Sequence, residues 1–172
     1  PRTAINCITL IHAKGDERSE DPVNRAELLK RAMFVICSRA SMPGYSSTPD
    51  LKDCEYVLGY FAEHLITSEE PYFSREFFIT KCREFLVKQL VHVNVEDILD
   101  LLIDNNIIIH TASGLTFRFA SWVFYFAAQR MHHNEKFAEL ILAGFNYTKF
   151  PEILEFYTGI DCRRTGALTR LT

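Results

Sequence analysis

The sequence predicts a mainly α fold: a helical subdomain, then a winged helix with a β-hairpin wing, then helical hairpins. Apolar residues recur at helical spacing through most of the chain, and this period gives way after Asn106 to two short strand-like stretches. Three predicted helices precede these stretches, which is the element order of a winged helix. We expect a small helical domain at residues 1–45, the winged helix at 46–131, and the start of a C-terminal helical sensor or repeat region at 132–172.

The composition indicates an ordinary globular protein. The chain has 172 residues, of which 48% are hydrophobic and 13% aromatic, so there is ample material for a core. Charged residues make up 24% and the formal net charge is -3, which is unfavourable for a general nucleic-acid binder. No pattern of a signal peptide or membrane span is visible, and the five widely spaced cysteines favour reduced core thiols. We therefore expect a cytoplasmic protein, and the abrupt start at Pro1 suggests a piece of a longer chain.

The first segment contains two predicted helices. Residues 4–13 carry isoleucine and leucine at helical spacing, and a polar, acidic loop follows at 14–22. Asn24 has the position of an N-cap, with Glu27 three residues later as in a capping box, and an apolar stripe continues to about residue 41. Residues 42–49, which contain two prolines, a glycine and three Ser or Thr residues, form the clearest linker in the sequence.

The next block supplies the winged helix. Pro49 suits the first position of a helix whose apolar face runs through residues 51–65, and Pro71 interrupts the chain. Ser74 and Asn94 are predicted N-caps of a second and a third helix. The wing is expected to pair residues 107–110 with residues 115–119 across a turn at 111–114.

Three further helices are predicted after the wing. Ser121 is expected to cap a helix through residue 131 that is apolar on almost every side and so must be buried. Asn134 is expected to cap the next helix, Pro151 to open the last one and Gly159 to end it. Such helix pairs are typical of the start of a superhelical array, although no repeat of fixed period is visible.

The sequence shows no self-contained catalytic motif. Its seven glycines form no phosphate-binding loop, so this chain alone is not expected to hydrolyse a nucleotide. His132 and His133 are adjacent and would point about 100° apart on a helix, which favours a solvated helix end over a metal site. Arg163 and Arg164 are better explained as a solvated or salt-bridged terminus than as a phosphate site.

DNA reading is the alternative that a winged helix always raises, because the third helix of many such domains enters the major groove. Here residues 95–105 contain four acidic residues and neither Lys nor Arg, and the wing adds only His110 and Arg118. Like charges would meet the phosphates, and no side chain of that helix is able to form the Arg–guanine pair. A protein-contact module is therefore favoured on the analogy of the fold.

Residues 117–128 read Phe-Arg-Phe-Ala-Ser-Trp-Val-Phe-Tyr-Phe-Ala-Ala. This stretch resembles the end of the winged helix in NACHT-type and related STAND signal-transduction ATPases, which commonly show an aromatic, an Arg, a His and then Tyr-Phe-Ala-Ala. Pro1 with residues 5–11 resembles the start of their small helical domain, and residues 24–28 resemble the Asn-Arg-x-Glu-Leu of its next helix. Residues 151–161 resemble the helical sensor region of bacterial members, so the resemblance spans most of the chain.

The resemblance implies a mechanism for a larger protein. A nucleotide-binding domain of the same polypeptide would hold ADP, then ATP with Mg²⁺, with Pro1 packing near the adenine. Sensing of a protein trigger would release the closed state, and the protein would form a homo-oligomer that activates an effector, in bacteria often for antiviral (antiphage) defence. The family's nucleotide-sensing His falls at Phe119 in this sequence, which leaves His110 and His132 as the histidines considered for that role.

The leading hypothesis is therefore a regulatory and assembly module of a STAND-type NTPase, which controls nucleotide-dependent activation and oligomerisation. The chain itself is expected to be no enzyme, to hold no metal or cofactor, and to bind neither DNA nor a membrane. The first alternative is a winged-helix protein-interaction scaffold with no nucleotide partner. A DNA-binding transcription regulator is the less favoured alternative, because of the acidic third helix.

Overall fold

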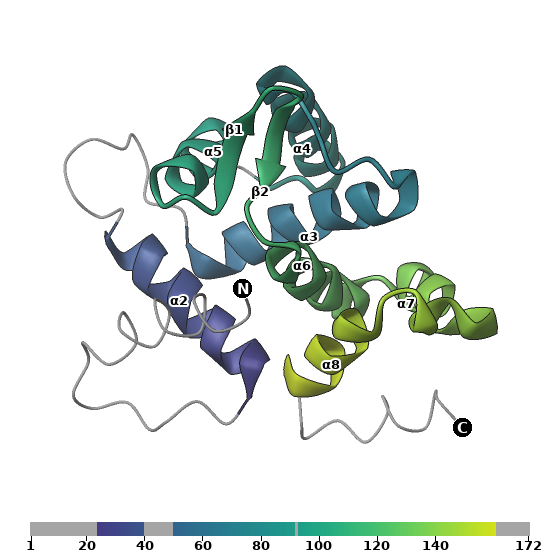
Figure 1. The fold of residues 1–172 in the computed structure, drawn as a ribbon. Coiled ribbons are helices and arrows are strands. Elements are labelled where there is room, and N and C mark those ends of the chain that lie inside the picture. The colour runs from purple at the N-terminus through teal and green to yellow at the C-terminus, as the bar shows by residue number, and fades with distance from the viewer. Residues whose placement is uncertain (1–23, 40–49, 92, 161–172) are drawn as a thin grey trace, which may run out of the picture.

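The computed structural model describes residues 24–39, 50–91 and 93–160, and these residues form a mainly helical fold (Figure 1). This confirms the predicted fold class. The elements, in chain order, are α2 (Arg25–Arg39), α3 (Leu51–Ser68), α4 (Arg75–Gln89), α5 (Val95–Asp104), β1 (Ile108–Thr111), β2 (Gly114–Phe117), α6 (Ala120–His133), α7 (Glu135–Leu142), a 3-10 helix η1 (Ala143–Thr148) and α8 (Pro151–Ile160). Within these ranges, no helix combines the length and the apolar character that crossing a bilayer requires.

Helices α3, α4 and α5 followed by the hairpin β1–β2 have the order of a winged helix. The two strands pair antiparallel, with Ile108 opposite Phe117 and Thr111 opposite Gly114. Phe73, between α3 and α4, forms two backbone hydrogen bonds of 3.0 and 2.8 Å with Leu115 and so makes an isolated β-bridge to β2. This bridge was not predicted from the sequence, because a single bridged residue leaves no periodic pattern.

The predicted hairpin is correct in kind, but its bounds differ: the first strand begins and ends one residue later than predicted, and the second begins one residue earlier and ends two residues earlier. The pairing begins at Ile108 rather than Ile107, because the Ile107 amide donates to the Leu102 carbonyl at 2.9 Å and continues the turn that ends α5. Gly114 opens β2 with a φ of 122°, a backbone conformation that L side chains rarely adopt. A Cβ atom at Gly114 would also lie 2.9 Å from the Phe73 carbonyl oxygen, so glycine is required where the Phe73 bridge meets the wing.

Four of the predicted helix caps are confirmed. The side chains of Asn24, Ser74, Asn94 and Asn134 each accept a hydrogen bond from a backbone amide two or three residues later, at 2.9–3.3 Å. These bonds satisfy amides that a helix start leaves without an intrahelical partner. Each cap therefore fixes the position at which its helix begins.

Two predicted helix ends are wrong. Ser121 lies inside α6, whose N-cap is Phe119 and has no side-chain capping bond. Gly159 does not end α8, which continues to Ile160. It is instead packed against α2, where an added Cβ would lie 3.2 Å from the Cβ of Ala26, so its small size serves helix contact rather than helix termination.

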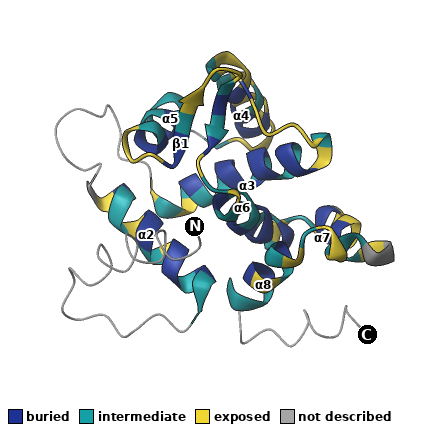
Figure 2. Cartoon of the chain, viewed as in Figure 1, coloured by how far each residue is buried: buried dark blue, intermediate teal, exposed yellow. Residues whose placement is uncertain are grey.

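Helix α6 is the centre of the fold. It packs against α3 on one side and α8 on another, and α2 lies against α8 (Figure 1). Buried positions occur along the helices from α2 to α8 (Figure 2), and their side chains form one core. The largest fully buried side chain is Tyr125 of α6. The predicted burial of this helix is confirmed, since six of its apolar side chains are buried: Trp122, Tyr125, Phe126, Ala127, Ala128 and Met131.

Several sequence predictions fall outside the residues that the structure describes. These are the helix at 4–13, the acidic loop at 14–22, the linker at 42–49, Pro1, Pro49, Cys7, Cys162, Arg163 and Arg164. The predicted boundary between residues 45 and 46 also lies there, and the one between 131 and 132 falls within α6. Both boundaries stay predictions.

Candidate functional site

The stretch that carries the family resemblance forms the junction between the wing and α6. Phe117 ends β2 as a buried residue, and the Arg118 amide donates to the Ile107 carbonyl at 2.8 Å. Phe119 is extended, with φ of -136° and ψ of 130°, and its carbonyl accepts from the Trp122 amide at 3.1 Å. A bend of only two residues, Arg118 and Phe119, thus leads from the wing into the buried helix.

Phe119 lies half-buried at the N-terminal end of α6. The guanidinium carbon of Arg118 lies 5.4 Å from the centre of its ring, within the range of a cation–π contact. A phenyl ring has no group that donates to a phosphate oxygen, so this position offers only apolar contact and its neighbouring cation.

The two histidines considered as substitutes lie elsewhere. His110 is exposed on β1, where it pairs with Leu115. His132 lies at the other end of α6, and the helical rise of 1.5 Å per residue puts about 20 Å of helix between it and Phe119. Its ring stacks on Tyr157 with 4.4 Å between the ring centres, and its Nε2 lies 3.1 Å from the Tyr157 carbonyl oxygen. The structure therefore does not bring either histidine to the start of α6.

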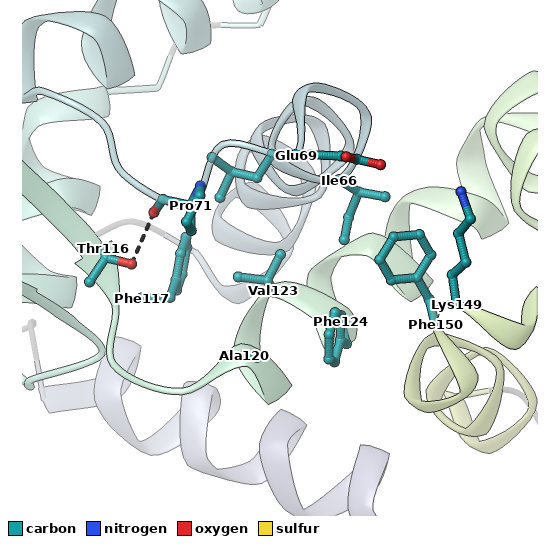
Figure 3. A pocket seen from close by; sticks show the side chains of 11 residues that line it. Ile66, Glu69, Pro71, Thr116, Phe117, Ala120, Val123, Phe124, Lys149 and Phe150 are labelled. Atoms are coloured by element: carbon teal, nitrogen blue, oxygen red, sulfur yellow. Dashed lines mark hydrogen bonds between the residues drawn. The ribbon is translucent and has the colours of Figure 1, made fainter. Parts of the chain in front are cut away.

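A groove of about 500 Å³ opens beside this junction (Figure 3). It lies between the end of α3, the wing, the first turns of α6 and the segment before α8. Its lining consists of Leu65, Ile66, Glu69, Pro71, Thr116, Phe117, Ala120, Val123, Phe124, Lys149 and Phe150. The Thr116 hydroxyl donates to the Pro71 carbonyl at 2.9 Å, which ties the wing to the loop after α3 at one side of the groove.

The groove is apolar inside and charged at its rim. The rings of Phe124 and Phe150 are neighbours in the lining, with 6.3 Å between their centres and 56° between their planes (Figure 3). The charged side chains of the lining are Glu69 and Lys149, both exposed. The volume lies in the range of small-molecule pockets, and the lining is mostly apolar, so the groove is suited to binding apolar groups.

Helix α5, the counterpart of a DNA-reading helix, presents carboxylates that are paired with arginines of α4. Arg75 donates two hydrogen bonds to Asp100, at 2.6 and 3.0 Å, and Arg83 pairs with Glu96. The hydrogen bond to Asp100 raises the pKa of Arg75, which therefore stays charged. The acidic helix is thus part of an ion-pair surface between α4 and α5.

Two polar clusters that the sequence analysis missed lie between α3 and α6. In one, Glu55 accepts hydrogen bonds from Tyr125 and Gln129. In the other, Glu63 accepts from Arg130 and Asn134. Each cluster joins a Glu of α3 to two side chains four residues apart, both on α6 in the first cluster, and on α6 and at its C-cap Asn134 in the second. The i, i+4 spacing of polar residues in an otherwise apolar stretch was the available signal.

The remaining site predictions concern metals and thiols. Cys37, Cys54 and Cys82 are free and buried, as predicted for core thiols. Across residues 24–39, 50–91 and 93–160, no three His, Cys, Asp or Glu side chains gather in a way that would hold a metal ion. Pro1, the predicted adenine contact, lies outside the described ranges.

Comparison with known proteins returned no relative for this chain: no family model matches it, and neither does any curated protein or solved structure.

Proposed function

We propose that this chain is the regulatory and assembly module of a STAND-type ATPase, in which it controls nucleotide-dependent activation and oligomerisation. The observation that carries the proposal is the position of residues 117–128, which join the wing to the buried helix α6 through a bend of only two residues. The resemblance of this stretch to the end of the STAND winged helix supplies the identity of the function.

The packing supports a role in coupling. Helix α6 contacts α3 of the winged helix on one side and α8 on the other. Because packed helices move as bodies, a displacement of α8 by a sensor would be passed to the wing through α6. The two polar clusters on α3 and α6 would hold that unit together during the movement.

The groove beside Phe119 is the face at which we place the nucleotide-binding domain of the same polypeptide. That domain would hold ATP or ADP with Mg²⁺, and Pro1 would pack near the adenine. Phe119 offers no hydrogen-bond donor, and the groove lining is mostly apolar, so this module would contact the other domain by packing rather than by sensing phosphates. The chain itself would perform no catalysis and would act in the cytoplasm.

A scaffold that uses no nucleotide is the second candidate, and the Phe at position 119 together with the apolar groove favours it. Such a scaffold would use the same groove for a protein partner. Nucleotide dependence separates the two functions, because only the first requires the docked domain to release ADP.

The test uses the full-length protein with Val123→Glu, which places a charge in the groove at a half-buried position. Val87→Glu is the matched control, since Val87 lies on α4 and is 75% exposed. Release of labelled ADP and oligomeric state by light scattering are measured on both variants. We expect Val123→Glu to release ADP at least about tenfold faster, which corresponds to a loss of about 1.4 kcal/mol of docking.

Parent-like ADP release from a folded Val123→Glu protein would contradict docking at the groove. If the full-length protein binds no nucleotide, the STAND assignment is contradicted and the protein-interaction scaffold is the function that remains. Calorimetry on the present chain alone adds a check, because we expect no low-micromolar binding of ATP or ADP without the phosphate-binding loop.

A further inference from the structure

Two cysteines from different helices meet inside the fold. The sulfur atoms of Cys37 in α2 and Cys54 in α3 lie 3.7 Å apart, in hydrogen-bond contact. Both are buried, with exposed fractions of 7% for Cys37 and 0% for Cys54. Cys82, the other cysteine within the described ranges, is buried in the core on α4, a different helix from either.

We propose that Cys37 and Cys54 are a redox modification site, at which a peroxide converts the two thiols into a disulfide between α2 and α3. A disulfide requires a sulfur–sulfur distance of about 2.05 Å, so the sulfur atoms must approach from 3.7 Å through side-chain rotation and a small helix shift. This inference is independent of the function proposed above.

The chemistry balances with hydrogen peroxide as the oxidant. The Cys37 thiolate attacks one peroxide oxygen, the O–O bond breaks, and the hydroxide that leaves takes up the thiol proton to become water. The Cys54 sulfur then displaces the hydroxyl group from the sulfenic acid of Cys37 as a second water, and the S–S bond forms. Two thiols and one peroxide thus give one disulfide and two waters, and the two electrons pass from sulfur to oxygen.

The environment assigns the two roles. The hydrogen bond with Cys54 lowers the pKa of the Cys37 thiol, although burial opposes the shift. The same contact and burial raise the pKa of Cys54. Cys37 is therefore the attacking thiolate, and Cys54 is the resolving thiol.

The linkage would act on how α2 is held. The N-terminal end of α2 is held to α8 by two hydrogen bonds. The side-chain Nδ2 of Asn24 donates to the Gly159 carbonyl at 3.0 Å, and Arg25 donates to Glu155 at 2.8 Å. Cys37 lies near the other end of α2, next to the winged helix. A disulfide there would fasten both ends of α2 and restrict any movement of α2 against α3.

The experiment oxidises the folded chain with hydrogen peroxide in a background that carries Cys7→Ser and Cys162→Ser. Trypsin cleaves after Arg39 and after Lys52, so the two cysteines fall in different peptides, and mass spectrometry without reductant reports whether those peptides are joined. We expect the joined pair, and a rise in Tm of about 5–15 °C that dithiothreitol reverses.

The variants make the result specific. Cys82→Ser should keep the joined peptides, whereas Cys37→Ala and Cys54→Ala should lose both the joined peptides and the rise in Tm. The proposal is overturned by sulfinic acid on unlinked Cys37, by a link that forms only in denaturant, or by a link between two chains. If an alanine variant fails to fold, the peptide map of the parent background still decides, because it keeps both cysteines.

Discussion

The phenol of Tyr125 donates a 2.5 Å hydrogen bond to the carboxylate of Glu55 and so joins α6 to α3 inside the fold. Tyr125 is fully buried, and the Gln129 amide completes the group with bonds of 3.2 Å to Glu55 and 3.0 Å to the phenol oxygen. Burial, followed by the charge of Glu55, raises the pKa of Tyr125 above its usual range. The phenol therefore stays protonated and acts as the donor to a charged acceptor.

Tyr125→Phe should lower the free energy of unfolding by about 1–3 kcal/mol, because a hydrogen bond to a charged group is lost and Glu55 keeps only its bond to Gln129. Urea titration measures the change. Tyr56→Phe is the matched control, because the 3.1 Å hydrogen bond from Tyr56 to Gln89 is exposed and should contribute only about 0.5 kcal/mol to stability. Equal losses in the two variants would mean that the Tyr125–Glu55 bond stabilises the fold no more than the exposed Tyr56–Gln89 bond does.

The sequence suggests an exposed Arg130 whose replacement by Ala would cost about 0.5 kcal/mol or less, and the structure shows that this expectation of exposure is wrong. Its side chain is 14% exposed, its Nε donates to Glu63 at 2.6 Å, and its guanidinium lies over the rings of Tyr60 and Phe85. The aliphatic part of an arginine is readily buried while its head finds a partner, which periodicity alone does not reveal.

Arg130→Ala should therefore cost about 2–4 kcal/mol, because Glu63 loses a charged partner in a partly buried place. Arg83→Ala serves as the control, since Arg83 pairs with Glu96 but its side chain is 60% exposed, and such pairs contribute about 0–1 kcal/mol. Thermal melts at two salt concentrations compare them. A loss of stability below about 0.5 kcal/mol for Arg130→Ala would contradict this prediction, because it is the size expected of an ordinary surface residue.

The local signals predicted the fold well. Caps at Ser74, Asn94 and Asn134 and the β-branched run after Asn106 predicted elements that the structure contains. These signals work because each is a short-range bond or a period of one element. The prediction for Gly159 was wrong because a glycine near the end of a helical pattern usually indicates helix termination. Here the glycine is explained by its close contact with Ala26 of another helix.

The candidate site was less predictable, since it depends on contacts between distant segments. The groove brings together Ile66, Phe124 and Phe150, which are far apart in sequence. The pairing of Cys37 with Cys54 likewise follows from the crossing of α2 and α3. Contacts between distant segments leave no periodic pattern in the sequence. The motif at residues 117–128 could therefore be found from the sequence, whereas the groove beside it could not.

Helix α5 leads to a prediction about nucleic acid. Its acidic residues include Glu96 and Asp100, which are paired with arginines of α4, so the helix presents no surplus of positive charge to a phosphate backbone. We expect no sequence-dependent mobility shift with duplex DNA at physiological salt. Reversing Arg75 and Arg83 to Glu should leave that result unchanged. A sequence-dependent shift that persists at physiological salt would contradict the protein-contact interpretation.

Trp122 tests whether α6 is the strut that holds the two halves of the fold. The side chain is 6% exposed, and its ring stacks on that of Phe126 with 5.9 Å between centres. Trp122→Ala and Phe126→Ala each remove a large aromatic from the core and should cost about 3–5 kcal/mol, a large part of a typical domain's stability. Thermal melts should show both variants unfolded or with separate transitions for the winged helix and for the helices after it.

Val87→Ala is the control for these melts, because Val87 is 75% exposed and should change stability by no more than about 0.5 kcal/mol. In the full-length protein the two aromatic substitutions should abolish activity through loss of folding, not through a nucleotide contact, since neither side chain lines the groove beside Phe119. Limited proteolysis separates these causes, because an unfolded strut exposes cleavage sites throughout α6. If Trp122→Ala melts like the parent, α6 is not the core of this chain, and the coupling of the wing to α8 must run through another element.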